Sequence, residues 1–136
     1  MEIRFENKVA FITGAAGGIG YAAARMFAEA GASVVMADLD SRVTDRAKEL
    51  EAEGHNAIGI RCDVSDEAQV KAAVEKAVAV FGKLDIAYNN VGIHAAVRED
   101  LAETEGWDFD RVISVNLRGV WNCMKYVSYT HLRAHE

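Results

Sequence analysis

The sequence predicts an α/β fold, a doubly wound parallel sheet with helices on both faces. Short apolar runs alternate with amphipathic segments of roughly 10 to 15 residues, as strands alternate with helices in such sheets. Glycine follows the amphipathic segments, as it often follows helices. Because parallel strands joined by a helix have right-handed crossovers, the alternation places the strands in one sheet. The 136 residues are expected to form one domain.

Four apolar runs are the expected strands, and they span residues 9–12, 33–38, 57–60 and 84–88. The helices between them are expected at residues 19–30, 41–53 and 66–81, followed by Gly31, Gly54 and Gly82. The third helix carries an apolar stripe, and Ser65 is its expected N-cap. A long loop after Asn89 precedes the last expected helix, which runs from Trp107 to about Met124.

Composition excludes several classes of partner. The 15 basic and 21 acidic residues give a formal net charge of −6, and the basic residues are scattered, so a nucleic-acid partner is not expected. No apolar run approaches the roughly 18 residues of a membrane span, and none resembles a signal peptide. Cys62 and Cys123 have neither disulfide nor metal spacing, which is typical of a cytoplasmic protein.

A glycine-rich loop joins the first expected strand to the first expected helix. Its residues allow a tight turn and bring backbone N–H groups at the positive end of the helix close to an anion. Glycine also marks plain turns, but the position between strand and helix is typical of a pyrophosphate-binding loop in a Rossmann-type fold. The residues expected to hold the pyrophosphate are Gly14, Gly17, Gly18, Ile19 and Gly20.

Asp38 supports this interpretation. It lies at the end of the second expected strand, roughly 20 residues after the loop, where an acid accepts hydrogen bonds from the adenosine ribose. A carboxylate there repels the additional phosphate of NADP, so NAD is the expected cofactor and NADP is less favoured. Arg42 is near enough in sequence to keep NADP open as an alternative.

The motif Thr13-Gly14-x-x-x-Gly18-x-Gly20 resembles the N-terminal signature of the short-chain dehydrogenase/reductase family. Three further segments are similar to the family's motifs, in the same order: Cys62-Asp63-Val64, Asn89-Asn90-Val91-Gly92 and Val115-Asn116-Leu117. Val91 stands where the family usually has alanine. The resemblance extends to about residue 126, so residues 1–126 are interpreted as an NAD(P)-binding Rossmann domain.

The resemblance also implies roles for single residues. Asp63 would bind the adenine through its carboxylate, Val64 through its backbone, and Asn90 would line the cofactor ribose. Asn116 would be the catalytic asparagine, which helps to hold a water for proton relay. For Asn89 we expect a structural role only, connecting two loops.

No metal site is expected. His131 and His135 have the spacing of two ligands on one helix face, but no third ligand accompanies them.

By resemblance, the complete protein would be an oxidoreductase that interconverts a small-molecule alcohol and a ketone or aldehyde by hydride transfer, and a homo-oligomer. The alternative is a non-catalytic module that binds a nucleotide or a partner protein. The family's catalytic serine and Tyr-x-x-x-Lys would follow residue 136, so this chain is expected to be inactive and its sheet incomplete, with about four strands. Residues 127–136 depart from the family pattern and are interpreted as a non-native tail.

Overall fold

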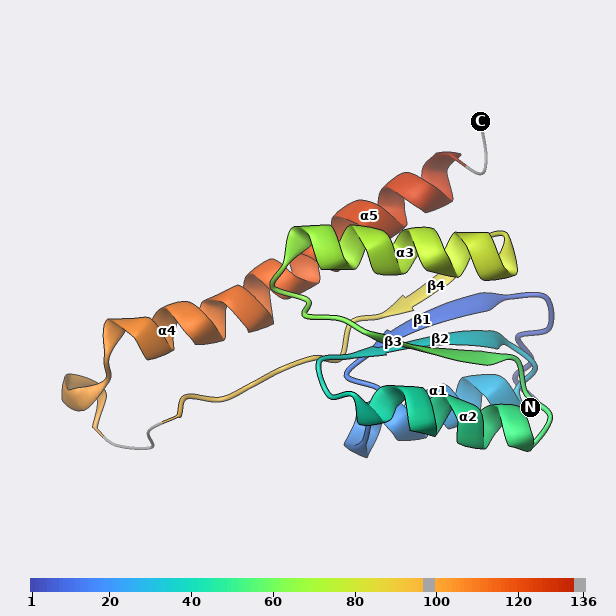
Figure 1. Cartoon of the computed structure of the whole chain (residues 1–136), viewed down its shortest axis with the longest axis horizontal. Helices are drawn as coiled ribbons and strands as arrows, with labels where there is room; N and C mark the ends of the chain where they lie inside the picture. Colours follow the sequence, from blue (N-terminus) through green and yellow to red (C-terminus); the bar gives the residue numbers. More distant parts are fainter. Residues whose placement is uncertain (97–99, 134–136) are drawn as a thin grey trace.

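The computed structural model describes residues 1–96 and 100–133, and it contains one four-stranded sheet (Figure 1). The strands are β1 (Val9–Thr13), β2 (Ser33–Asp38), β3 (Ala57–Arg61) and β4 (Ile86–Tyr88). All are parallel, in the order β3-β2-β1-β4, which confirms the predicted α/β sheet. The chain builds outward from β1 to β3 and then adds β4 on the other side of β1. The sheet therefore has its switch point between β1 and β4, where ligands bind in such folds.

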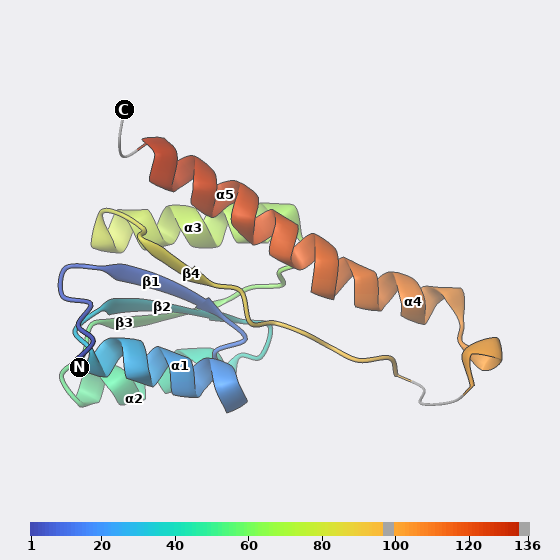
Figure 2. The same cartoon turned by 180° about the vertical axis from the view of Figure 1, so that it is seen from behind.

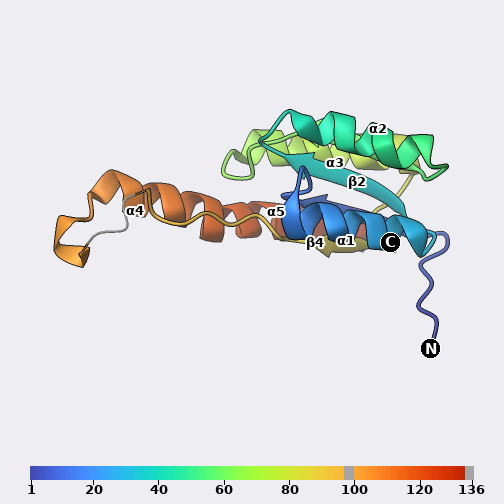
Figure 3. The ribbon, with the colours of Figure 1, turned by 90° about the horizontal axis from the view of Figure 1, so that it is seen from below.

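Helices cover both faces of the sheet. The helical segments are α1 (Gly18–Glu29), α2 (Arg42–Ala52), α3 (Glu67–Phe81), a short 3₁₀ turn (Leu101–Glu103), α4 (Gly106–Ile113), a π-helical turn (Ser114–Arg118) and α5 (Gly119–Arg133). Helices α1 and α2 lie on one face, and α3 and α5 on the other (Figures 1 and 3). Helix α4 continues the line of α5 beyond the end of the sheet (Figure 2). No described helix is long and apolar enough to cross a bilayer.

Successive side chains of each strand point to opposite faces of the sheet, so the buried residues form two clusters, one on each face. On one face, Ile12 and Met36 pack with Ala24 of α1 and Leu50 of α2. On the other face, Phe11 and Val35 pack with Val70 and Val74 of α3 and with Cys123 of α5. Burial on both faces explains why β1 and β2 are apolar without interruption rather than alternating.

The N-terminus of α3 corrects one expectation. Its N-cap is Asp66, not Ser65, because the Asp66 carboxylate accepts hydrogen bonds from the amides of Ala68 and Gln69. The Ser65 hydroxyl instead donates to Asp63. The predicted end of the helix is confirmed, since Gly82 has a φ of 83° in the left-handed region.

The last helical segment is longer than predicted, and β4 is shorter. The helical backbone begins at Gly106 and ends at Arg133, well beyond Met124. Residues 127–133 therefore form the last turns of α5, and Val127 packs against the cluster beneath α3. Strand β4 begins only at Ile86, and just before it the Asp85 backbone amide donates to the Val9 carbonyl while the Asp85 carboxylate accepts the Val9 amide.

Candidate functional site

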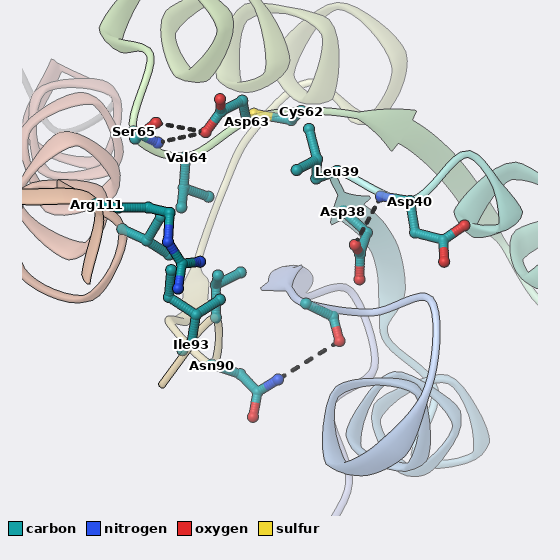
Figure 4. Close-up of a pocket in the computed structure, with 14 residues that line it drawn as sticks. Asp38, Leu39, Asp40, Cys62, Asp63, Val64, Ser65, Asn90, Ile93 and Arg111 are labelled. Carbon is teal, nitrogen blue, oxygen red and sulfur yellow. Dashed lines mark hydrogen bonds between the residues drawn. The ribbon is translucent and has the colours of Figure 1, made fainter. Parts of the chain in front are cut away.

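A cavity of about 750 Å³ lies beyond the carboxyl ends of the strands, at the switch point. Its lining comes from the loops after all four strands and from the helical segment after the long loop (Figure 4). Among the lining residues are Gly14, Asp38, Asp63, Val64 and Asn90. The structure thus brings five of the predicted site residues around one space. Arg111 lines the cavity from α4.

The glycine-rich loop has the geometry that a pyrophosphate requires. A Cβ atom at Gly20 would lie 2.0 Å from the carbonyl oxygen of Gly14, so only glycine lets α1 approach this closely. Gly17 is the N-cap of α1 and supplies no side-chain acceptor. Within the described residues, the amides of Gly18, Ile19 and Gly20 donate no hydrogen bond. The N-terminus of α1 therefore offers free donors and a positive helix end to an anionic group.

Asp38 connects the glycine-rich loop to the loop after β2. Its Oδ2 atom accepts the Ala16 amide at 3.0 Å, and its Oδ1 atom accepts the Asp40 amide at 2.9 Å. A carboxylate oxygen can accept more than one hydrogen bond, so ribose hydroxyl groups can still bind to Asp38. Both contacts fix the carboxylate at the rim of the cavity before any ligand is present.

Arg42 is paired with Asp40. Its guanidinium lies 2.7 Å from the Asp40 carboxylate, and its backbone amide donates to the same carboxylate. Hydrogen bonding to Arg42 lowers the pKa of Asp40, and the same contact raises the pKa of Arg42. The guanidinium is therefore neutralised locally and does not stand alone as a phosphate-binding cation.

Asp63 and Val64 lie together in a turn at the end of β3. The Asp63 Oδ1 atom accepts the Ser65 amide at 2.9 Å and the Ser65 hydroxyl at 2.6 Å. No donor within the described residues bonds the other carboxylate oxygen. The Val64 carbonyl accepts the side-chain amide of Asn122, and the Val64 amide has no acceptor in the described part of the chain. The second carboxylate oxygen of Asp63 is thus a free acceptor, and the Val64 amide beside it is a free donor, for a ligand.

Asn90 has the structural role that we expected for Asn89. The Asn90 side chain donates to the carbonyl oxygen of Thr13 at 3.2 Å, and its backbone amide donates to the Thr13 hydroxyl at 3.1 Å. These bonds connect the loop after β4 to the glycine-rich loop. The Asn89 side-chain oxygen is instead buried, with no hydrogen bond among the described residues. Asn90 also lines the cavity.

Asn116 lies in the π-helical turn and holds the chain after β4. Its Oδ1 atom accepts the Ile93 amide at 2.8 Å, and its Nδ2 atom donates to the Ile93 carbonyl at 2.8 Å. Both ends of the side-chain amide are used, so this side chain positions Ile93, which lines the cavity. π-Helical turns occur frequently at functional sites. The catalytic role of Asn116 stays a prediction.

Asp108 and Arg111 also contribute to the site, and the sequence did not reveal them. Asp108 is only 1% exposed, and its carboxylate accepts the Ala96 amide at 2.8 Å. The Arg111 guanidinium donates to Asp108 at 2.8 Å and to the carbonyl of His94 at 3.0 Å. We call this pair the Asp108–Arg111 clamp. In the sequence, the only indication of this clamp was an acidic and a basic residue three positions apart in an expected helix.

Both cysteine thiols are buried. Burial raises the pKa of Cys62, at the cavity wall, to about 12, and that of Cys123 to about 11. Neither thiol is a nucleophile at neutral pH. The described residues include no group of three His, Cys, Asp or Glu side chains placed to bind a metal. His135 lies outside the described residues.

Comparison with known proteins identifies the family. A family model described as enoyl-(acyl carrier protein) reductase matches residues 14–135. Secoisolariciresinol dehydrogenase of Forsythia intermedia is 44% identical over 92% of this chain and 45% of its own length. Cis-4-hydroxycyclohexanecarboxylate dehydrogenase of Sinomonas cyclohexanicum is 43% identical over 90% of this chain and 49% of its own length. The chain belongs to the short-chain dehydrogenase/reductase family, as its motifs predicted.

Two solved structures are similar in fold. A short-chain dehydrogenase/reductase from Burkholderia phymatum in complex with NAD has a TM-score of 0.92 and 36% identity, and covers 98% of this chain and 47% of that protein. A gluconate 5-dehydrogenase from Burkholderia cenocepacia in complex with NADP and tartrate has a TM-score of 0.85 and 36% identity, with coverages of 94% and 50%. The chain thus spans about half the length of the relatives it matches.

Proposed function

We propose that this chain binds NAD in the cavity at the switch point and forms the cofactor-binding part of an oxidoreductase. The observation that carries the proposal is the juxtaposition of three features at one edge of the sheet. The Asp38 carboxylate and the Asp63–Val64 turn line the cavity, and the free N-terminus of α1 follows Gly14, which also lines it. They match the three parts of an adenine dinucleotide: the pyrophosphate, the ribose and the base.

The pyrophosphate would bind at the glycine-rich loop. The amides of Gly18, Ile19 and Gly20 have no acceptor among the described residues, and a Cβ at Gly17 or Gly18 would meet no atom within 4 Å. Open space and free donors at the same place suit an anion that must approach the backbone closely. Gly14 forms the turn that leads into this position, with a φ of 69°.

The adenosine would bind between two carboxylates. Asp38 would accept hydrogen bonds from the ribose hydroxyl groups, and the free Oδ2 atom of Asp63 would accept the 6-amino group of adenine. The Val64 amide would donate to a ring nitrogen. Asn90 would line the cofactor ribose that follows the pyrophosphate, since it borders the cavity beside the glycine-rich loop.

NAD is favoured over NADP by the charges at the ribose end. Asp38 and Asp40 place two carboxylates there, and Arg42 is engaged with Asp40. A 2′-phosphate would meet negative charge without an unpaired cation from Arg42. Structural relatives are found with either cofactor, so the preference rests on these residues of the chain.

The reaction itself would be hydride transfer between the nicotinamide ring of the bound cofactor and a small-molecule alcohol or carbonyl compound. The relatives named above are dehydrogenases, which supports this class over a non-catalytic binding module. We propose Asn116 as the catalytic contribution of this chain. Residues 1–136 contain no Tyr-x-x-x-Lys, so we expect them to bind the cofactor without turnover. The buried free thiols support a cytoplasmic location.

Isothermal titration calorimetry of the chain with NAD and NADP tests the cofactor proposal. We expect NAD to bind at least tenfold more tightly than NADP, and Asp38→Asn to reduce this ratio toward one because it removes the charge. Asp45→Asn, at an exposed position on α2, is the control and should leave the ratio unchanged. Tighter binding of NADP would overturn the role given to Asp38, and no binding of either dinucleotide would overturn the proposed function.

A further inference from the structure

Asn122 is a fully buried polar residue that the motifs do not include. It lies on α5 with 0% exposure, and its Nδ2 atom donates to the carbonyl of Val64 at 2.8 Å. Its Oδ1 atom is buried and has no hydrogen bond within the described residues. A buried amide with one unsatisfied atom is costly, and an apolar side chain of similar size would avoid that cost. Its one hydrogen bond therefore needs an explanation.

That hydrogen bond acts on the turn that contains the proposed adenine contacts. The Asp66 amide donates to the Asp63 carbonyl at 3.1 Å and closes the turn, so the peptide between Val64 and Ser65 is its central peptide. Asn122 binds the oxygen of this peptide, and the Asp63 carboxylate binds its N–H at 2.9 Å. β-Turn types differ by a rotation of this central peptide. Here its carbonyl and its N–H are both hydrogen-bonded to side chains, which prevents that rotation.

The same peptide fixes the Asp63 carboxylate. One carboxylate oxygen is occupied by the Ser65 amide and hydroxyl, which leaves the other for a ligand. The hydrogen bonds thus form a continuous path from the Asn122 side chain, through the Val64–Ser65 peptide, to the Asp63 carboxylate. Hydrogen bonds in such a chain polarise and strengthen one another.

Helix α5 lies close enough for this contact because of Gly119. A Cβ atom at Gly119 would lie 2.6 Å from the Cγ2 atom of Val64. Gly119 and Asn122 are three residues apart and so share one face of α5. Val64 is therefore held by its side chain against Gly119 and by its carbonyl against Asn122.

We propose that Asn122 is a positioning residue for the adenine base, holding the turn after β3 so that the Asp63 carboxylate and the Val64 amide face the cavity together. This inference rests on the proposed function. Asn122 does not touch the base; it acts through the turn. A loss of Asn122 should therefore weaken recognition of the adenine edge rather than the binding of phosphate.

The test compares AMP with IMP, in which a carbonyl replaces the 6-amino group of the base. The wild-type chain should prefer AMP, because a carboxylate accepts from an amino group and repels a carbonyl oxygen. Asn122→Leu fills the same space without the donor. We expect it to weaken AMP binding about tenfold and to bring the AMP/IMP ratio toward one, as measured by calorimetry.

Cys123→Ala is the matched control, since Cys123 is the next buried residue on the same helix and forms no hydrogen bond with the turn. It should lower the melting temperature yet keep the AMP/IMP ratio of the wild type. If Asn122→Leu does not fold, Asn122→Ala replaces it and should show the same loss of preference. An unchanged ratio in a folded Asn122 variant would overturn this inference alone, whereas a wild-type chain that binds neither AMP nor NAD would overturn the proposed function.

Discussion

A methyl group at Gly20 would lie 2.0 Å from the Gly14 carbonyl oxygen, whereas one at Gly17 would meet no atom within 4 Å. Gly17 also has extended backbone, with a φ of −171°, which any residue adopts. The two glycines of one loop therefore have different reasons to be glycine. Gly20 allows α1 to pack on the loop, and Gly17 leaves room for a ligand.

We expect Gly20→Ala to lower the free energy of unfolding by about 3 kcal/mol, the upper part of the range for overpacking. Gly17→Ala should lower it by only about 1 kcal/mol, because the added methyl group meets no atom within 4 Å and the main loss is a poorer N-cap, yet it should weaken NAD binding. Urea denaturation and calorimetry measure the two effects. Equal losses of stability in both variants would contradict this division of roles.

The two thiols give a second prediction for single residues. Because burial raises the pKa of Cys62 to about 12 and that of Cys123 to about 11, both stay protonated up to about pH 9. We expect neither to react with an aromatic disulfide reagent in the native chain, and both to react once urea unfolds it. Rapid reaction of one thiol at pH 8 without denaturant would show that this thiol is accessible in the folded chain, contrary to its burial.

At the scale of elements, the segment after β4 depends on side chains of one helical stretch. Residues 93–96 form no strand, yet side chains bind the amide and carbonyl of Ile93, the carbonyl of His94 and the amide of Ala96. Asn116 and the Asp108–Arg111 clamp supply all of these bonds. The wall of the cavity is therefore held by α4 and the π-helical turn rather than by the sheet.

Asp108→Asn should release the end of this segment. The Ala96 amide and the Arg111 guanidinium bond different oxygens of the carboxylate, and asparagine replaces one of these oxygens with an NH₂ group, which donates and cannot accept. We expect hydrogen exchange of the Ala96 amide, followed by NMR, to become about tenfold faster, which corresponds to about 1.4 kcal/mol. Glu75→Gln, in the exposed Lys71–Glu75 pair of α3, is the control and should leave this rate unchanged.

The contact of β4 with β1 should make stability depend on pH. Burial alone would raise the pKa of Asp85, but its hydrogen bond from the Val9 amide and its ion pair with Lys83 outweigh this and lower it. Since the pKa is lower in the folded chain, Asp85 stabilises the fold above its unfolded pKa. That contribution is lost as the pH falls through the folded pKa.

We expect Asp85→Asn to lower the free energy of unfolding by about 1 kcal/mol at pH 7. The difference from the wild type should shrink as the pH is lowered below about 4, near the unfolded pKa of aspartate. Denaturant titrations at several pH values measure it, with Asp45→Asn as the exposed control. A difference that grows toward acid pH would contradict the assigned direction.

At the scale of the whole molecule, the long helical stretch exposes a row of large apolar side chains. They recur every three or four residues and are Phe109, Ile113, Leu117, Trp121 and Met124. Exposed apolar surface of this extent is typical of an interaction site. Together with β4, which pairs only with β1 among the described strands, it leaves an apolar helix face and a strand edge open to contact with another chain.

The pair of substitutions Leu117→Glu and Trp121→Glu tests this surface. We expect the wild-type chain to self-associate at micromolar concentration in sedimentation velocity experiments, and the double variant to sediment as a monomer. Both side chains are more than half exposed, so the substitutions should leave the fold intact, which circular dichroism checks. Equal self-association of both forms would exclude this row of residues as the contact.

The fold class and five of the residues that line the cavity could be predicted from the sequence. Apolar runs, helical periodicity and glycines at turns are local signals, and they located all four strands and the glycine-rich loop with Asp38. Several helix and strand ends were wrong by a few residues because capping depends on hydrogen bonds, as with Asp66 in place of Ser65.

The side chains that hold the site in place could not be predicted from the sequence. Adjacent residues after a strand point in different directions, so the register of β4 on β1 made Asn90, rather than Asn89, the contact with Thr13. Asn122 meets Val64 across 58 residues of sequence because α5 packs over the turn after β3. Such contacts arise from how distant segments meet in space, and no local pattern of residue types encodes them.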